Sequence, residues 1–109
     1  MAFDAGLVEL IRGDLAEVEG ITEKRMFGGI CFLQHGNMLC GVSAQGAMFR
    51  VGKDSEAAAR AIPGTGPMQF TGRSMAGFVD ADDDLMADDA RRGRVMALAL
   101  AYLATLPPK

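Results

Sequence analysis

The sequence has few residues of the types that carry chemistry in small proteins, with two cysteines and one histidine among 109 residues. Cys31 and Cys40 are too few for a disulfide framework, and they do not have the spacing of a CxxC motif. The only imidazole, His35, has no neighbouring carboxylate to position it for general acid–base catalysis. We therefore predict that the protein is not an enzyme and that it holds no metal or other cofactor.

Long hydrophobic runs and an excess of positive charge are also missing. The longest apolar run covers residues 95–104, whereas a helix that spans a bilayer needs about 20 apolar residues. Asp4 and Glu9 interrupt the amino-terminal region, so it does not have the pattern of a signal peptide. The net charge of −3 gives no overall attraction to nucleic acid or to anionic lipid. We expect a cytoplasmic protein that does not enter the membrane.

The residues that are present have an ordinary globular balance, with 50% hydrophobic and 23% charged. A chain of this length has the size of one domain and can hide about 65% of its unfolded surface. We therefore predict a single domain over residues 1–109.

The beginning of the chain has the apolar spacing of a helix. Asp4 is placed to cap a helix over residues 4–18, and Gly20 is placed to end it. The apolar stripe of this helix consists of Leu7, Leu10, Ile11, Leu15 and Val18.

The central part of the chain has the pattern of short strands. Residues 22–51 predict three or four strands, with tight turns at Gly36-Asn37 and Gln45-Gly46. The later elements are a helix over 53–62, a loop over 64–67, strands over 68–71 and 75–80, and a helix from 82–84 to 106. The predicted core face of the last helix is Val95, Leu98, Ala99, Tyr102, Leu103 and Leu106.

The order of these elements predicts an α+β fold, α-β-β-β-(β)-α-β-β-α. Strands joined by short turns are antiparallel, because a parallel connection needs a crossover of a dozen residues or more. We expect an antiparallel sheet of five or six strands with three helices packed against it. The part of the sheet that the helices leave uncovered is where a partner would bind.

The double glycine Gly28-Gly29 lies between a charged segment and an apolar strand. We predict that one of the two has a backbone conformation forbidden to other residues, or that another segment approaches it closely. A bulge or kink there would bend one continuous strand into two. Gly36, Asn37 and Gly72 are assigned to turns.

Cys31 and Cys40 lie on either side of the Gly36-Asn37 turn. Counting residues through that turn places both side chains on the same face of the sheet. Buried free thiols that pack as small hydrophobes are favoured, and a redox-sensitive pair or half of a metal site are the alternatives.

Methionines are frequent, with eight in the chain. Core filling is the favoured interpretation, and an adaptable surface for a partner is the alternative. The methionines in or beside predicted strands are Met26, Met38, Met48, Met68 and Met75.

Acidic residues cluster before the last helix. They match part of a calcium-loop template, but Leu85 and Arg91 stand where that template needs glycine and glutamate. Helix capping by carboxylates is the better interpretation. The cluster consists of Asp80, Asp82, Asp84 and Asp88.

Basic residues outside the last helix come from separate strands and turns. If they converge, they form a contact surface for an acidic partner or for DNA phosphate, and otherwise they are solvated. We assign partner binding to Lys24, Arg25, Arg50 and Arg73, with Lys53 nearby in the sequence and Arg91, Arg92 and Arg94 as a second group. Sequence-specific DNA binding by this chain alone is not expected, because no helix-turn-helix is recognisable.

Several separated motifs resemble the TfoX N-terminal domain family, named for the TfoX/Sxy regulator of natural competence. The resemblance implies an α+β domain that co-activates competence genes together with the cyclic-AMP receptor protein. The full regulator also has a helix-rich second domain, which we do not expect in this chain. The motifs are residues 22–29, 36–38, 50–52, 68–75 and 106–109.

Two functions follow as hypotheses. The first is a protein-interaction module that regulates transcription of competence-type genes through a protein partner. The second is a stand-alone small domain of unrelated function that binds another partner or a ligand. The sequence also allows a homodimer.

Overall fold

The computed structural model describes the backbone of residues 4–26, 28–70 and 73–109, and the side chains of these residues except 68–70 and 73–75. Gly72, assigned to a turn by the sequence, lies outside the described residues.

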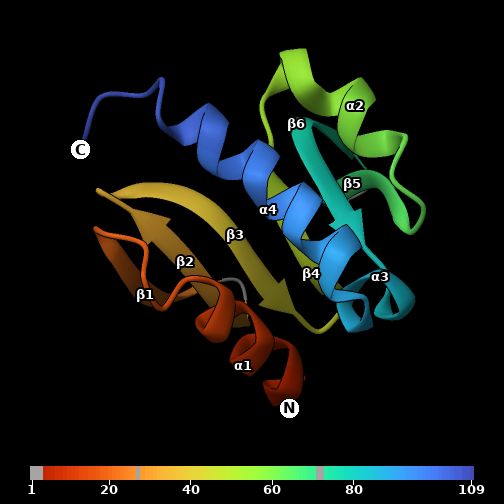
Figure 1. Cartoon of the computed structure of the whole chain (residues 1–109), viewed down its shortest axis with the longest axis horizontal. Coiled ribbons are helices and arrows are strands. Elements are labelled where there is room, and N and C mark those ends of the chain that lie inside the picture. Colours follow the sequence, from red (N-terminus) through yellow and green to blue (C-terminus); the bar gives the residue numbers. More distant parts are fainter. Residues whose placement is uncertain (1–3, 27, 71–72) are drawn as a thin grey trace.

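The described residues form six strands and four α-helices (Figure 1). The helices are α1 (Ala5–Asp14), α2 (Glu56–Arg60), α3 (Asp83–Ala87) and α4 (Asp89–Leu103), and a short 3₁₀ helix, η1 (Lys53–Ser55), precedes α2. The strands are β1 (Ile21–Met26), β2 (Gly29–Gln34), β3 (Asn37–Ser43), β4 (Gly46–Arg50), β5 (Thr65–Phe70) and β6 (Arg73–Ala81).

The strands form one sheet in the order β1-β2-β3-β4-β6-β5, and every neighbouring pair is antiparallel. After β4 the chain passes through η1 and α2 and enters the sheet again at its far edge as β5. It then turns back as β6, which fills the place between β4 and β5. The α+β class, the antiparallel sheet and the order of the elements are confirmed.

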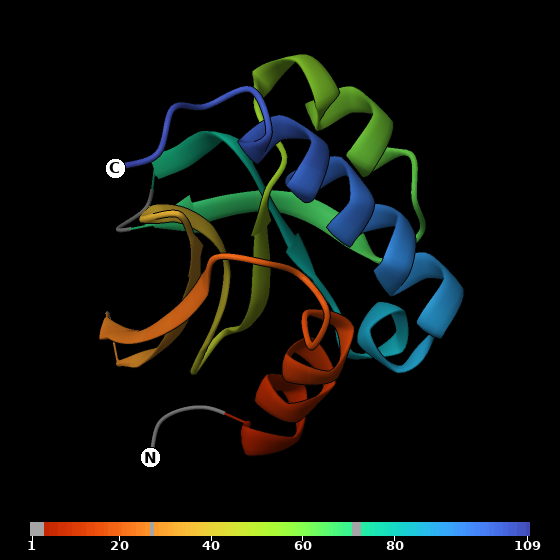
Figure 2. The ribbon, with the colours of Figure 1, turned by 60° about the vertical axis from the view of Figure 1, so that its left-hand side comes forward.

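The helices lie on one face of this sheet, which we call the inner face (Figures 1 and 2). Buried side chains of all four helices form one cluster with the inner-face residues of the strands. No described helix covers the opposite face, which we call the outer face. Because side chains alternate along a strand, the pairing register assigns to the outer face Thr22, Lys24, Cys31, Leu33, Met38, Gly41, Met48, Gly66 and Asp80.

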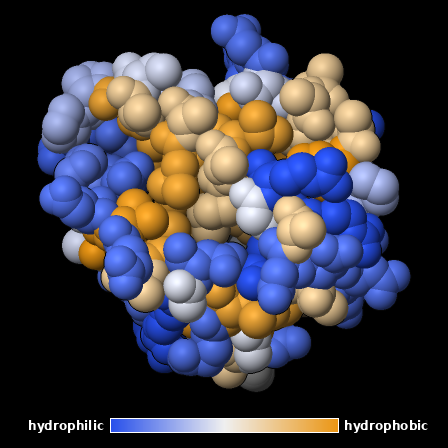
Figure 3. All heavy atoms as spheres, in the orientation of Figure 1, coloured by the Kyte–Doolittle hydropathy of each residue, from blue (hydrophilic) through white to orange (hydrophobic). Residues whose placement is uncertain are grey.

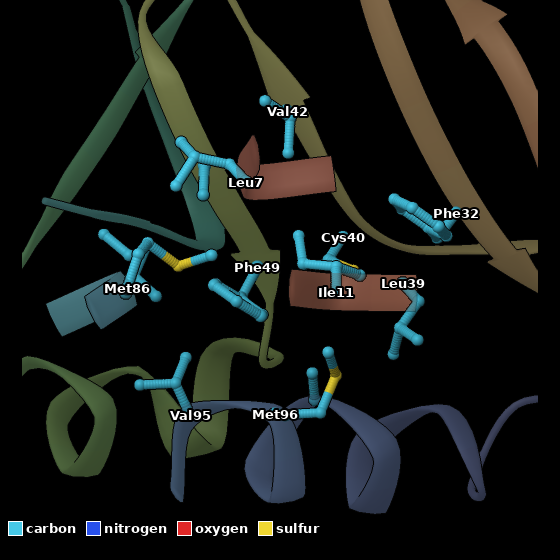
Figure 4. Packing of buried hydrophobic residues seen from close by; sticks show 14 of the residues in the cluster. Leu7, Ile11, Phe32, Leu39, Cys40, Val42, Phe49, Met86, Val95 and Met96 are labelled. Atoms are coloured by element: carbon cyan, nitrogen blue, oxygen red, sulfur yellow. The ribbon is translucent and has the colours of Figure 1, made fainter. Parts of the chain in front are cut away.

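The core is centred on Phe49 of β4, whose side chain is fully buried. Figure 4 shows Ile11 of α1 and Val95 of α4 near this ring, with Met86 of α3 on a third side. Residues from the beginning, middle and end of the chain therefore meet at one strand. On the surface of the same side, apolar residues form a band between β1 and α4 that hydrophilic residues border (Figure 3).

Helix α1 is shorter than the sequence predicts. Asp4 caps it as expected, because its carboxylate accepts a hydrogen bond from the Gly6 amide at 2.8 Å. The helix ends at Asp14 and continues as single turns, and Gly20 (φ +80°) lies just before β1 instead of ending the helix. Leu15 is still buried, but Leu10 is 36% exposed and does not belong to the core face.

The last predicted helix is two helices that meet at Asp88. This residue has an extended backbone (φ −101°, ψ 107°), and its carboxylate accepts hydrogen bonds from the Ala90 and Arg91 amides at 3.0 and 3.1 Å. Asp82 caps α3 in the same way through the Leu85 amide at 2.8 Å. Capping is confirmed for Asp82 and Asp88, whereas Asp80 lies in β6 and Asp84 lies inside α3. The cap at Asp88 also explains why the predicted single helix is interrupted there.

The register of α4 differs in part from the predicted core face. Val95, Ala99 and Leu103 are buried as expected, and Met96 joins them. The other three predicted positions pack only at the edge of the core and are half-buried: Leu98, Tyr102 and Leu106.

Two further boundaries differ from the prediction. The helix predicted over 53–62 is η1 followed by α2, which ends at Arg60. Strand β5 begins inside the predicted loop, because Gly64 (φ +101°) redirects the chain and Thr65 pairs with Ala81. The Thr65 hydroxyl donates to the Ala59 and Ile62 carbonyls within 2.8–2.9 Å, and this anchors the start of the strand.

Both short hairpin turns lie one residue earlier than predicted. His35 (φ +51°) and Gly36 (φ +85°) make the β2–β3 turn, so Asn37 is the first residue of β3. Asn37 is buried and its side-chain amide donates to the Pro107 carbonyl at 2.9 Å. This bond holds the carboxyl-terminal segment against the hairpin, a contact between residues 70 positions apart.

The described strand methionines do not fill the core. Met26, Met38 and Met48 are half-buried, and their strand positions assign all three to the outer side of the sheet. The buried methionines are instead Met86 and Met96, on α3 and α4.

The double glycine makes a hairpin and not the predicted kink in a continuous strand. Strands β1 and β2 are antiparallel neighbours, and Met26 pairs with Gly29 across their connection. Gly28 has φ +74°, a value that residues with a Cβ rarely adopt. A Cβ on Gly29 would overlap the carbonyl oxygen of Val42, because β3 passes directly beside it.

We expect Gly29→Ala to lower the free energy of unfolding by about 2 kcal/mol, since strand β3 must move to admit the methyl group. Gly93→Ala is the matched control, because Gly93 lies in α4 with open space around its Cβ position. The control should stabilise the protein by about 0.5–1 kcal/mol through helix propensity. Urea unfolding measures the stability of both variants. Equal stabilities of Gly29→Ala and Gly93→Ala would contradict the close approach of β3 to Gly29.

A buried arginine joins α1 to the junction of α3 and α4. Arg92 is 5% exposed, and its guanidinium donates to Asp14 at 2.7 and 3.2 Å and to the Met86 carbonyl at 2.6 Å. It also donates to Asp89 at 2.9 Å. The bond to Asp14 is the main cause that raises the pKa of Arg92, so the group is charged at every relevant pH.

Replacing Arg92 by methionine should lower the free energy of unfolding by about 2–3 kcal/mol, because it leaves the Met86 carbonyl and Asp14 without their partner. Arg94→Met, at an exposed position of the same helix, should change it by less than about 0.5 kcal/mol. Thermal unfolding of the two variants side by side makes the comparison. A loss of the same size in both would show that Arg92 contributes only its helix propensity.

Candidate functional site

The four basic residues assigned to partner binding lie on three different strands. Lys24 and Arg25 are exposed on β1, which is one edge of the sheet. Arg50 is the last residue of β4, and Arg73 is the first residue of β6. With a strand spacing of about 4.8 Å, β1 and β6 are about 19 Å apart along the sheet. Lys24 and Arg25 are therefore far from the strands of Arg50 and Arg73 along the sheet, and the side chain of Arg73 lies outside the described residues.

Lys24 and Arg25 also belong to opposite faces, because they are consecutive in a strand. Arg25 shares the inner side with Glu23, whose carboxylate accepts hydrogen bonds from Arg12 of α1 at 2.7 and 2.8 Å. These bonds lower the pKa of the Glu23 carboxyl. Lys24 stands on the outer face opposite Cys31. Charged side chains on an edge strand discourage pairing with strands of other chains.

Two described contacts position Arg50. Its guanidinium carbon lies 5.5 Å from the centre of the Tyr102 ring, and one of its nitrogens donates to the Met38 carbonyl at 3.4 Å. An arginine over an aromatic face at this distance has a cation–π attraction. Gly52 makes the arrangement possible, because a Cβ there would overlap the Tyr102 ring.

A cavity of about 600 Å³ opens beside this pair. We call it the Arg50 groove. Its walls are the end of β4, η1, residues 76–78 in the middle of β6, and the last turn of α4 with the residues that follow it. Its polar lining residues are Arg50, Lys53, Asp54, Ser55, Tyr102 and Thr105.

Gly77 of β6 holds the base of the groove in place. With φ +85°, it accepts hydrogen bonds at its carbonyl from the Val51 and Gly52 amides at 2.8 and 3.0 Å. Its own amide donates to Glu56 of α2 at 2.9 Å. The groove is therefore built from fixed backbone, and Lys53 is exposed at its entrance.

The chemistry of the groove suits binding. Its described lining offers two cations, one carboxylate and three hydroxyl groups, without an imidazole or thiol to activate a nucleophile. In the described part of the chain, no group of three or more His, Cys, Asp or Glu side chains could hold a metal ion. Sequence reasoning assigned Tyr102 to the core and so missed it as a wall of this site, although it is the only tyrosine of the chain.

The two cysteines lie on opposite faces, which corrects the sequence prediction. The register shifts between Phe32 and Leu33, so that Cys40 pairs with Phe32 and Cys31 pairs with Gly41. Leu39 is the extra residue, and it reverses the parity of β3 relative to β2. Both thiols are free and buried, and burial raises the pKa of each, so both are protonated near neutral pH.

The second basic group has mainly structural contacts. Arg91 bonds to Asp88 at 3.0 Å and to the Pro63 carbonyl at 3.0 Å, and Arg92 is buried. Only Arg94 is a well-exposed member of this group. The histidine has a backbone role, because the His35 amide donates to the Gly20 carbonyl at 2.9 Å.

The family model of the TfoX N-terminal domain matches residues 14–102, which is most of the chain. The chain belongs to the TfoX N-terminal domain family. No curated protein and no solved structure shows significant similarity to it. Among the residues described for this TfoX N-terminal domain, no helix is long and apolar enough to cross a membrane.

We expect the Arg50–Tyr102 contact to appear as a coupling of about 0.5–1 kcal/mol in a double-mutant cycle. The cycle compares Arg50→Leu, Tyr102→Leu and the double variant by urea unfolding. Arg60→Leu with Tyr102→Leu serves as the control cycle, because Arg60 is exposed on α2 outside the groove. Additive effects in both cycles would show that the ring does not hold the guanidinium.

Proposed function

We propose that this TfoX N-terminal domain is a non-enzymatic protein-interaction module that regulates transcription of competence-type genes through a protein partner. Membership in the family supports a regulatory role. The observation that carries the proposal is the Arg50 groove, a polar site with a firmly held arginine and an exposed lysine.

The groove fits an acidic segment of a partner protein. A guanidinium forms paired hydrogen bonds with a carboxylate, and the Tyr102 ring has already reduced the rotational freedom of Arg50. Arginine and tyrosine are also the residues that most often dominate the binding energy of protein interfaces. Lys53, at the entrance, attracts the same charge and mainly raises the rate of association.

The partner we propose is a cytoplasmic transcription regulator, such as the cyclic-AMP receptor protein that the family resemblance implies. In this proposal the partner regulator, and not this domain, recognises the DNA sequence. The second candidate is a stand-alone domain of unrelated function, which binds another protein or a ligand in the same groove. The cavity of about 600 Å³ is large enough for a short peptide segment or a small ligand.

The test uses the full chain as bait in its own cells at low expression, followed by titration with the purified captured protein and with the cyclic-AMP receptor protein. Lys53→Glu and Arg50→Glu should each weaken binding about tenfold, and salt should slow association of the wild-type chain. Arg94→Glu is the control, since it makes the same charge change on an exposed helix position away from the groove.

Three results separate the alternatives. Loss of binding in Arg25→Glu but not in Lys53→Glu would move the binding surface to β1. Unchanged binding in all variants would contradict a role for these basic residues. A captured protein with no role in transcription would favour the second candidate, and a reporter for competence genes in the deletion strain gives an independent readout.

A further inference from the structure

The outer face of the sheet carries a row of described residues that crosses five neighbouring strands at one level. Pairing places Lys24 beside Cys31, Cys31 beside Gly41, Gly41 beside Met48, and Met48 beside Asp80. The row begins with a positive charge on β1 and ends with a negative charge on β6. Gly41, on β3, is its midpoint.

The row has the composition of an interface centre with a polar rim. Cys31 is 2% exposed although it is outside the helix-covered core cluster, and Met48 lies close to the space above Gly41. Met38 and Leu33 continue this apolar surface at the next level, and both are half-buried. Methionine is enriched in interfaces, because its flexible side chain adapts to a partner.

The two charged ends have no ion-pair partner among the described residues of their own chain. Both Lys24 and Asp80 are exposed. They are four strand spacings apart, about 19 Å, so they cannot reach each other within one sheet.

A two-fold axis parallel to β3 would bring them together between two copies. Rotation about an axis above Gly41 reverses the order of the strands, so the β1 end of one row meets the β6 end of the other. Lys24 of each copy then faces Asp80 of the other, and Met48 faces Cys31. The smallest residue of the row lies on the axis, where the two sheets approach most closely.

We propose that a second copy of this chain packs on the outer face, with paired Lys24–Asp80 contacts at both ends of the row. A two-fold contact is self-complementary, so the Lys24–Asp80 ion pair forms twice, once at each end of the row. The order of charges in the row favours a second copy as the partner. One chain has Lys24 at one end and Asp80 at the other, and the two-fold axis places each of them opposite the other residue of the second copy. The proposal is independent of the Arg50 groove, because it needs neither Arg50 nor Lys53.

The test is a charge exchange, followed by sedimentation velocity over a concentration series of the full chain. The wild-type chain should dimerise, and Lys24→Asp or Asp80→Lys alone should weaken dimerisation about tenfold or more, because each creates two like-charge contacts. The double variant Lys24→Asp/Asp80→Lys should restore it. A mixture of the two single variants should form a heterodimer, since both of its end contacts join opposite charges.

Lys53→Asp is the control, because it makes the same change of charge at an exposed position of the groove. Thermal unfolding of each variant checks that the exposed substitutions leave the fold intact. Met48→Glu, at the centre of the row, should also prevent dimerisation.

Three outcomes would overturn the proposal. A wild-type chain that is monomeric at all concentrations excludes the second copy. A dimer that does not respond to the charge exchange uses another surface. A monomeric chain that loses its captured regulator through Met48→Glu assigns the outer face to that regulator instead.

Discussion

Burial of Phe49 is the interaction on which the rest of the structure depends. Its ring lies in the central strand β4 and is fully enclosed, with side chains of α1, α3 and α4 around it. Full burial of one such side chain contributes about 1.5–3 kcal/mol, and here it also joins segments that are far apart in the chain. Because α1, α3 and α4 pack toward this point, the part of the inner face around Phe49 is used for stability.

The Arg50 groove follows directly from that arrangement. Strand β4 leaves the core at Val51, which is buried, and the residues on either side of it face the carboxyl-terminal turns of α4. Arg50 meets the Tyr102 ring on one side, and Gly52 allows that ring to lie against the backbone on the other. The motif Arg50-Val51-Gly52 therefore combines the arginine of the proposed binding site, a buried core residue and a glycine that the Tyr102 ring approaches closely.

Charged residues have two distinct uses in this chain. Arg92 and Arg91 bond to carboxylates and carbonyls of neighbouring elements, and they hold the helices to one another. Lys24, Lys53 and Arg94 are exposed, so their charges can act on other molecules. Sequence alone does not separate the buried members of the second basic group from the exposed one, because burial depends on which helix faces another. The family membership agrees with a binding role but does not select among these surfaces.

Local patterns determined much of the fold from the sequence. Helical spacing, the capping carboxylates of Asp4, Asp82 and Asp88, and short turns between apolar runs depend on residues close together in the chain. The antiparallel sheet follows from those short turns. What the tertiary structure decided depends on contacts between distant segments: the extra residue Leu39 in β3, which separates the two thiols, and the placement of Arg92 between α1 and α4. No local pattern contains these, because a bulge is set by packing across strands and a buried charge is stable only where its distant partners converge.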